Sequence, residues 1–72
     1  MLRIEKETES IRNVYREEEK VGMIYKDIDS QWTFSHNGYI ELTFEEMQWI
    51  LAEFFKIRGK DRGSKVIWTE GP

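Results

Sequence analysis

The segment from Thr43 to Arg58 constrains the fold more than any other part of the chain, because it carries a full set of helix signals. Thr43 followed by Glu46 predicts a capping box, in which hydroxyl and carboxylate each accept a free N–H of the first turn. Gly59 then provides the residue type that commonly ends a helix in the left-handed conformation. At 100° per residue the apolar side chains fall within an arc of about 160°, which predicts one core-facing surface. These side chains are Phe44, Met47, Ile50, Leu51, Phe54, Phe55 and Ile57.

A single amphipathic helix needs an apolar partner, and the preceding residues have the alternation and turn chemistry of β-strands. We expect strands over 21–26, 31–35 and 39–42. The Asn37-Gly38 pair favours the positive φ angles of a tight hairpin between the last two. After the helix, residues 65–69 predict a short final strand.

The first twenty residues fit two structures. Leu2 and Ile4 alternate as in a strand, whereas the apolar residues within 11–15 have helical spacing. We favour a strand over about 10–17, paired with the segment that follows it, because three apolar residues make a thin helical pattern. The predicted fold is therefore α+β, a small antiparallel meander of three to five strands with one helix, about 43–58, packed across it.

At 72 residues the chain has room for a single domain, and we expect it to span 1–72. Residues 1–9 are expected to be less ordered, and 70–72 to form an untied tail. A hydrophobic content of 39%, with 14% aromatic residues, argues against disorder. The chain contains no cysteine, which excludes disulfides, thiol catalysis and cysteine-ligated metals. With no signal peptide and no membrane-length apolar run, the predicted location is cytoplasmic, away from membranes.

Three motifs suggest catalysis or ligand binding, and each is better explained by turn chemistry. Asp27 and Asp29 resemble the start of a calcium loop, but the glycine and glutamate positions that follow do not match. His36 beside Ser35 is expected to cap a turn, since a domain this small offers little depth for a pocket. The glycines and basic residues of 59–65 lack phosphate-loop spacing and leave a helix instead of entering one. We therefore predict no enzyme activity, no cofactor, no metal and no small-molecule substrate.

Trp49 is the residue that the predicted fold does not explain. On the helical wheel it lies opposite the apolar arc, among Glu45, Glu53 and Lys56. Either the N-terminal segment covers it, through Ile4 or Ile11, or it is an anchor for a protein partner, since tryptophan is enriched in binding hot spots. We predict a small regulatory module that binds another protein, or a second copy of itself, through Trp49, Glu45, Glu53 and Lys56.

The distribution of charge supports an alternative function. The net charge is −3 overall, but residues 21–55 carry −5 and residues 56–72 carry +3. A single-stranded nucleic acid could bind the basic segment and stack its bases on strand aromatics such as Trp32, Phe34 and Trp68. The acidic middle of the chain opposes this, and the same rings are also the expected core beneath the helix. The basic candidates are Lys56, Arg58, Lys60, Arg62 and Lys65.

Overall fold

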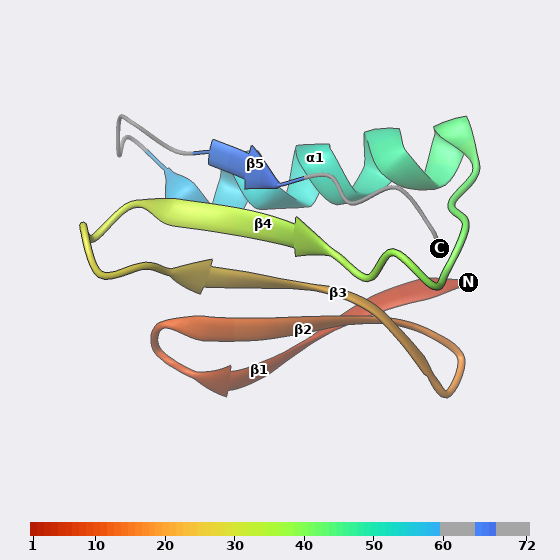
Figure 1. The fold of residues 1–72 in the computed structure, drawn as a ribbon, viewed down its shortest axis with the longest axis horizontal. Helices are drawn as coiled ribbons and strands as arrows, with labels where there is room; N and C mark the ends of the chain where they lie inside the picture. The colour runs from red at the N-terminus through yellow and green to blue at the C-terminus, as the bar shows by residue number, and fades with distance from the viewer. Residues whose placement is uncertain (60–64, 68–72) are drawn as a thin grey trace.

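The computed structural model describes residues 1–59 and the backbone of 65–67, and it shows a five-stranded sheet with one helix on one of its faces (Figure 1). The strand order is β1-β2-β3-β4-β5. The first four strands form an antiparallel meander, and β5 pairs with β4 in parallel after the helical crossover. This confirms the predicted α+β class. The elements are β1 (Leu2–Thr8), β2 (Ile11–Arg16), β3 (Glu19–Lys26), β4 (Trp32–His36), α1 (Phe44–Arg58) and β5 (Lys65–Ile67).

The N-terminal region forms two strands. β2 pairs with β3 throughout, as predicted for a strand over about 10–17. Residues 1–9, which were expected to be less ordered, include β1, and Leu2–Thr8 pair with β2 and form an edge of the sheet. The expected tail at 70–72 lies outside the described residues.

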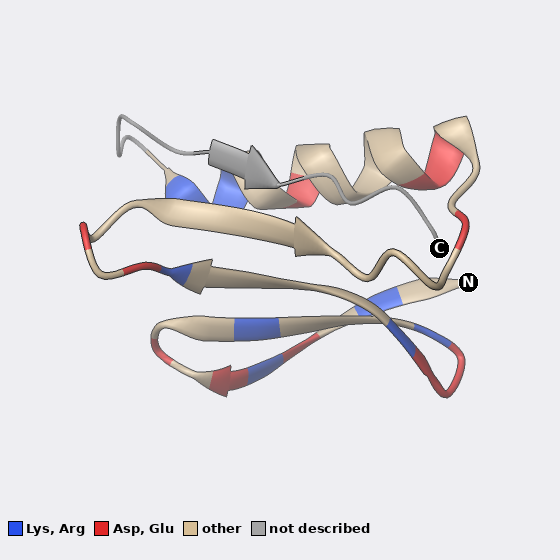
Figure 2. Ribbon diagram, viewed as in Figure 1, with Lys and Arg blue, Asp and Glu red and all other residues tan. Residues whose placement is uncertain are grey.

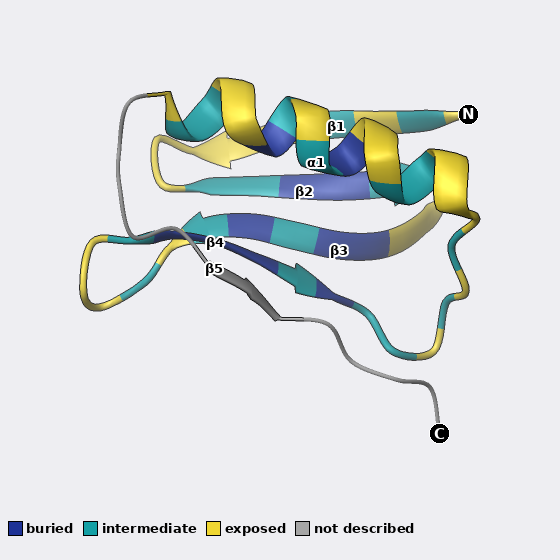
Figure 3. Cartoon of the chain, turned by 90° about the horizontal axis from the view of Figure 1, so that it is seen from above, coloured by how far each residue is buried: buried dark blue, intermediate teal, exposed yellow. Residues whose placement is uncertain are grey.

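The core lies between α1 and the sheet face that it covers (Figure 3). The strand registers place Ile4 opposite Val14, and Ile24 opposite Phe34, so that these alternate residues share the face beneath the helix. The predicted core positions Trp32 and Phe34 are buried, whereas Trp68 lies outside the described residues. The buried apolar residues are Val14, Val21, Ile24, Trp32, Phe34, Ile50 and Phe54.

The expected strand over 39–42 is absent, and these residues form an irregular connection from β4 to α1. Asn37 directs the chain away from β4, since its side-chain oxygen accepts a hydrogen bond from the Tyr39 amide at 3.1 Å. The Ile40 amide also donates to the Asn37 carbonyl at 3.0 Å, which closes a turn. The prediction of positive φ at Gly38 was also wrong, because Gly59 is the one glycine within residues 1–59 that has it.

The helix begins and ends as predicted. Thr43 is its N-cap in a complete capping box with Glu46, and Gly59 follows its last residue with φ of 57°. The predicted apolar arc, however, is wider than the helix surface that packs against the sheet. Phe44 and Phe55 are 71% and 53% exposed, contrary to their predicted core positions. Both lie about 100° or more around the helix from the direction midway between the buried Ile50 and Phe54, beyond the reach of the sheet.

Gly22 is required by close packing between β3 and β4. A Cβ atom at this position would lie 2.8 Å from the Ser35 carbonyl oxygen and 2.8 Å from Cε1 of Phe34. We expect Gly22→Ala to lower the free energy of unfolding by about 1–3 kcal/mol, because backbone as well as side chain must shift. Urea denaturation measures this, with Lys20→Ala on the exposed start of the same strand as the control. Equal stability of Gly22→Ala and wild type would contradict the close approach.

Candidate protein-interaction surface

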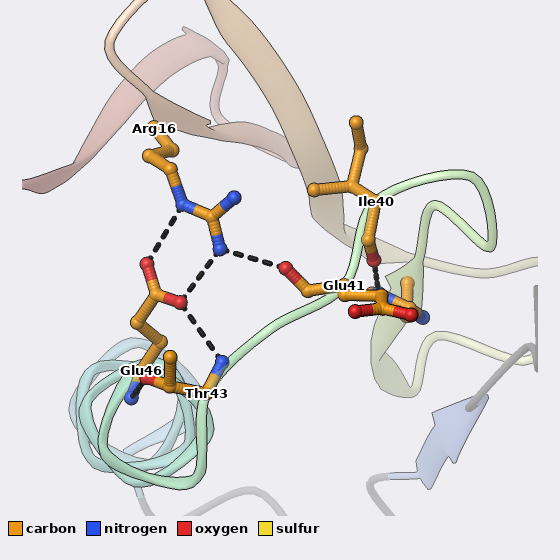
Figure 4. Close-up of polar contacts among 6 residues, drawn as sticks. Arg16, Ile40, Glu41, Thr43 and Glu46 are labelled. Atoms are coloured by element: carbon orange, nitrogen blue, oxygen red, sulfur yellow. Dashed lines mark hydrogen bonds and ion pairs between the residues drawn. The ribbon is translucent and has the colours of Figure 1, made fainter.

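The start of α1 is fixed to the sheet by a bidentate ion pair between Arg16 on β2 and Glu46 (Figure 4). The Arg16 Nε and Nη2 atoms donate to the two carboxylate oxygens of Glu46 at 2.9 and 2.6 Å. Glu46 Oε1 also accepts the Thr43 amide at 2.9 Å, so one carboxylate closes the capping box and the ion pair together. The position of the helix start is therefore set by a strand thirty residues earlier in the chain.

This arrangement changes the acidity of both groups. The Arg16 hydrogen bonds, followed by the bond from the Thr43 backbone, lower the pKa of Glu46 to about 2. The Glu46 carboxylate in turn raises the pKa of Arg16. Both side chains are mostly shielded from solvent, with exposed fractions of 28% and 21%. The pair is consequently worth more than an ion pair on an open surface.

The connection between β4 and α1 is held from both sides. His36 is buried at the end of β4, and its Nε2 lies 2.7 Å from the Ile40 carbonyl oxygen. This confirms the expected turn-capping role of the histidine. On the other side, Arg16 Nη2 donates to the Glu41 carbonyl at 2.7 Å. The residues that lead into the helix are thus fixed before its first turn begins.

Trp49 lies on the flank of α1 that faces the N-terminal end of β1. Its side chain is 37% exposed and borders an open hollow of about 210 Å³. Met1 and Leu2 line the same hollow, so the N-terminal segment borders Trp49, which stays partly exposed. Leu2 makes this approach, where sequence reasoning named Ile4 or Ile11. The remaining lining residues are Thr43, Glu45 and Glu46.

The charged residues predicted around Trp49 differ in their own contacts. Glu53 pairs with Lys56 at 3.4 Å on the same helix. Glu46 is occupied by Arg16, as described above. Glu45 is exposed and forms no hydrogen bond or ion pair with the described part of the chain. The uncompensated charge at the rim of the hollow is therefore that of Glu45.

The basic residues predicted to bind nucleic acid are described only in part. Lys56 is paired with Glu53, and the Arg58 guanidinium lies 4.8 Å from the centre of the Phe55 ring. Lys60 and Arg62 lie outside the described residues, and Lys65 is described by its backbone alone. Because Trp32 and Phe34 are buried, they are not available as rings on which bases stack.

The acidic turn between β3 and β4 is stabilised by hydrogen bonds within the turn. Asp27 Oδ1 accepts the amides of Asp29 and Gln31 at 2.9 and 3.0 Å, as turn chemistry predicts. Within the described residues no group of three or more histidine, aspartate or glutamate side chains is placed to hold a metal. No helix among them is long and apolar enough to cross a membrane.

Sequence reasoning missed the role of Arg16 and the second hollow that it borders. This open depression of about 610 Å³ lies between the end of β2 and the β4–α1 connection. Tyr39, which is 81% exposed, forms part of its wall with Ile40 and Leu42. No local sequence motif indicates that Arg16 contacts partners 25 and 30 residues away in the chain.

The chain matches no protein-family model, no curated protein and no solved structure.

Glu46→Gln is expected to destabilise the protein by about 1–2 kcal/mol at neutral pH, since a bidentate charged contact is lost. Because the pKa of Glu46 is lowered to about 2 in the fold, its stabilising effect is present above the ordinary value of 4.5. That effect disappears as the pH falls from 4.5 towards 2, where wild type and variant converge. Urea denaturation at several pH values measures this.

Glu45→Gln is the matched control, because the neighbouring carboxylate has no partner among the described residues. A difference between wild type and Glu46→Gln that persists unchanged at pH 2 would contradict the ion pair as its source.

Proposed function

We propose that this chain is a non-enzymatic, regulatory protein-interaction module that binds its partner through the α1 flank around Trp49. The observation that carries the proposal is the partly exposed indole of Trp49, which borders a hollow with the Glu45 carboxylate at its rim. A partly exposed tryptophan offers an interface a large and rigid contact area.

The surface is pre-organised for binding. The Arg16–Glu46 ion pair and the capping box fix the first turn of α1, one turn before Trp49. The buried Ile50 next to it anchors the same part of the helix in the core. Little ordering is left to occur when a partner docks, so more of the contact energy remains for affinity.

The charges favour a basic group on the partner. Glu45 is the acidic side chain at the hollow whose charge is not compensated by a described neighbour. A lysine or arginine entering the hollow would meet this carboxylate and the face of the Trp49 ring together, and both attract cations. A phosphate backbone would instead be repelled by the same carboxylate, which favours a protein partner over a nucleic acid.

Site-specific photocrosslinking tests this proposal. We expect a photoreactive phenylalanine analogue at position 49 to give one discrete adduct with a protein partner or with a second copy. Excess wild-type chain should suppress the adduct, whereas excess Trp49→Ala should suppress it at least about tenfold less, given the usual cost of truncating an interface tryptophan. The same analogue at Gln48, an exposed position on a different side of the helix, is the control.

Equal labelling at positions 48 and 49, or competition by Trp49→Ala as strong as by wild type, would refute the proposal. Either result would mean that the Trp49 flank makes no specific contact.

A further inference from the structure

β1 is an open edge of the sheet. It pairs with β2 on one side, and on its other side no strand of the described residues lies beside it (Figure 1). Its pairing is regular from Leu2 to Lys6, and an irregularity follows between Lys6 and Thr8. A strand that leaves its second row of backbone groups unpaired offers them to another chain.

We propose that this edge pairs antiparallel with β1 of a second copy, about a two-fold axis that passes beside Ile4. This inference deepens the proposed function and rests on it, since it names the partner of the Trp49 flank. In this register Leu2 lies opposite Lys6 of the second copy, Arg3 opposite its Glu5, and Ile4 opposite its Ile4. The five residues from Leu2 to Lys6, which are the regular part of the strand, then all take part.

The charges along β1 select this register. Both signs occur on the strand (Figure 2), with Arg3 and Glu5 exposed on the face away from α1. With the axis beside Ile4, each arginine faces a glutamate across the new pair. Moving the axis to Arg3 or to Glu5 would place like charges directly opposite each other, which is unfavourable. The strand is thus complementary to itself in one register.

The side chains needed for these contacts are already on the correct face. Arg3 and Glu5 form an ion pair of 2.7 Å, and the Arg3 guanidinium lies 4.8 Å from the centre of the Tyr15 ring. Arg3 also donates to the Glu17 carbonyl. Pairing of two copies would bring two such ion pairs together as a square of alternating charge, without moving either pair from the sheet.

The hollow beside Trp49 provides a second, independent match. Leu2 lines this hollow, and Lys6 of the second copy lies opposite Leu2 on the same sheet face. Its ammonium group would therefore enter between the Trp49 ring and Glu45. Lys6 is paired at present with Glu9 at 2.7 Å, but that ion pair is exposed and is readily exchanged. The two-fold axis makes this contact twice.

A charge-exchange experiment tests the register. Arg3→Glu and Glu5→Arg each place like charges opposite one another in the homodimer. We expect each variant alone to dissociate at least about tenfold more readily than wild type. An equimolar mixture should associate again, because one variant carries glutamate at both positions and the other carries arginine at both, so that opposite charges meet at both contacts. Sedimentation velocity over a hundredfold concentration range measures all four samples.

Both variants change exposed side chains, and circular dichroism with thermal unfolding verifies that each is folded. Lys6→Glu provides a further test, because it reverses the charge that enters the Trp49 hollow and should also weaken association. Glu7→Lys is the matched control, since Glu7 lies beyond the regular pairing.

The results separate this inference from the proposed function. Wild type that stays monomeric, or a mixture that associates no better than its components, would overturn the pairing with a second copy. A discrete heterologous adduct at position 49 would then still support the interaction module. Conversely, restored association in the mixture without any specific crosslink at position 49 would support the β1 pairing and remove the Trp49 flank from it.

Discussion

The position of the α1 start over the sheet, and with it the Trp49 flank, depends on the ion pair between Arg16 and Glu46. It joins the last residue of β2 to the first turn of α1, and the same carboxylate completes the helix cap. Arg16 also holds the Glu41 carbonyl, so the strand, the connection and the helix meet at one guanidinium. Without this contact the helix start would be oriented mainly by apolar packing, which is far less directional than a bidentate ion pair. The ion pair therefore also helps to set the orientation of Trp49, which lies one turn further along the helix.

Local signals explain why much of the fold could be predicted. Residues close together in the sequence specify both ends of the helix, through the capping box of Thr43 and Glu46 and the positive φ of Gly59. The helix therefore has the predicted bounds within one residue. The exposure of Phe44 and Phe55 could not be predicted, because the apolar arc does not reveal how wide a stripe the sheet can cover. The irregular residues 39–42 were missed for a related reason. Their hydrogen bonds go to Asn37, His36 and Arg16, and the last of these lies far away in the sequence.

Trp49 shows how far sequence reasoning reaches at the candidate site. Its isolation from the apolar arc was visible on a helical wheel, and so were the surrounding charges. Which of those charges is uncompensated was not visible, since Glu46 and Glu53 are distinguished from Glu45 by their partners alone. The contribution of Met1 and Leu2 to the hollow depends on the strand order, which brings the N-terminus to the edge beside α1. The helical wheel identified Trp49, whereas the residues around it follow from the strand order.

Charged side chains on an edge strand usually prevent association, and β1 carries four of them between Arg3 and Glu7. The order of these charges along the strand decides whether they also prevent pairing with a second copy of the chain. A strand with charges of a single sign repels every copy of itself in every register, whereas opposite charges placed symmetrically about an apolar residue attract one register and repel its neighbours. Arg3 and Glu5 flank Ile4 in this symmetric way. In the proposed pairing, the charges that keep unrelated strands from the edge make it selective for a second copy, whose Lys6 would lie against Glu45 and Trp49.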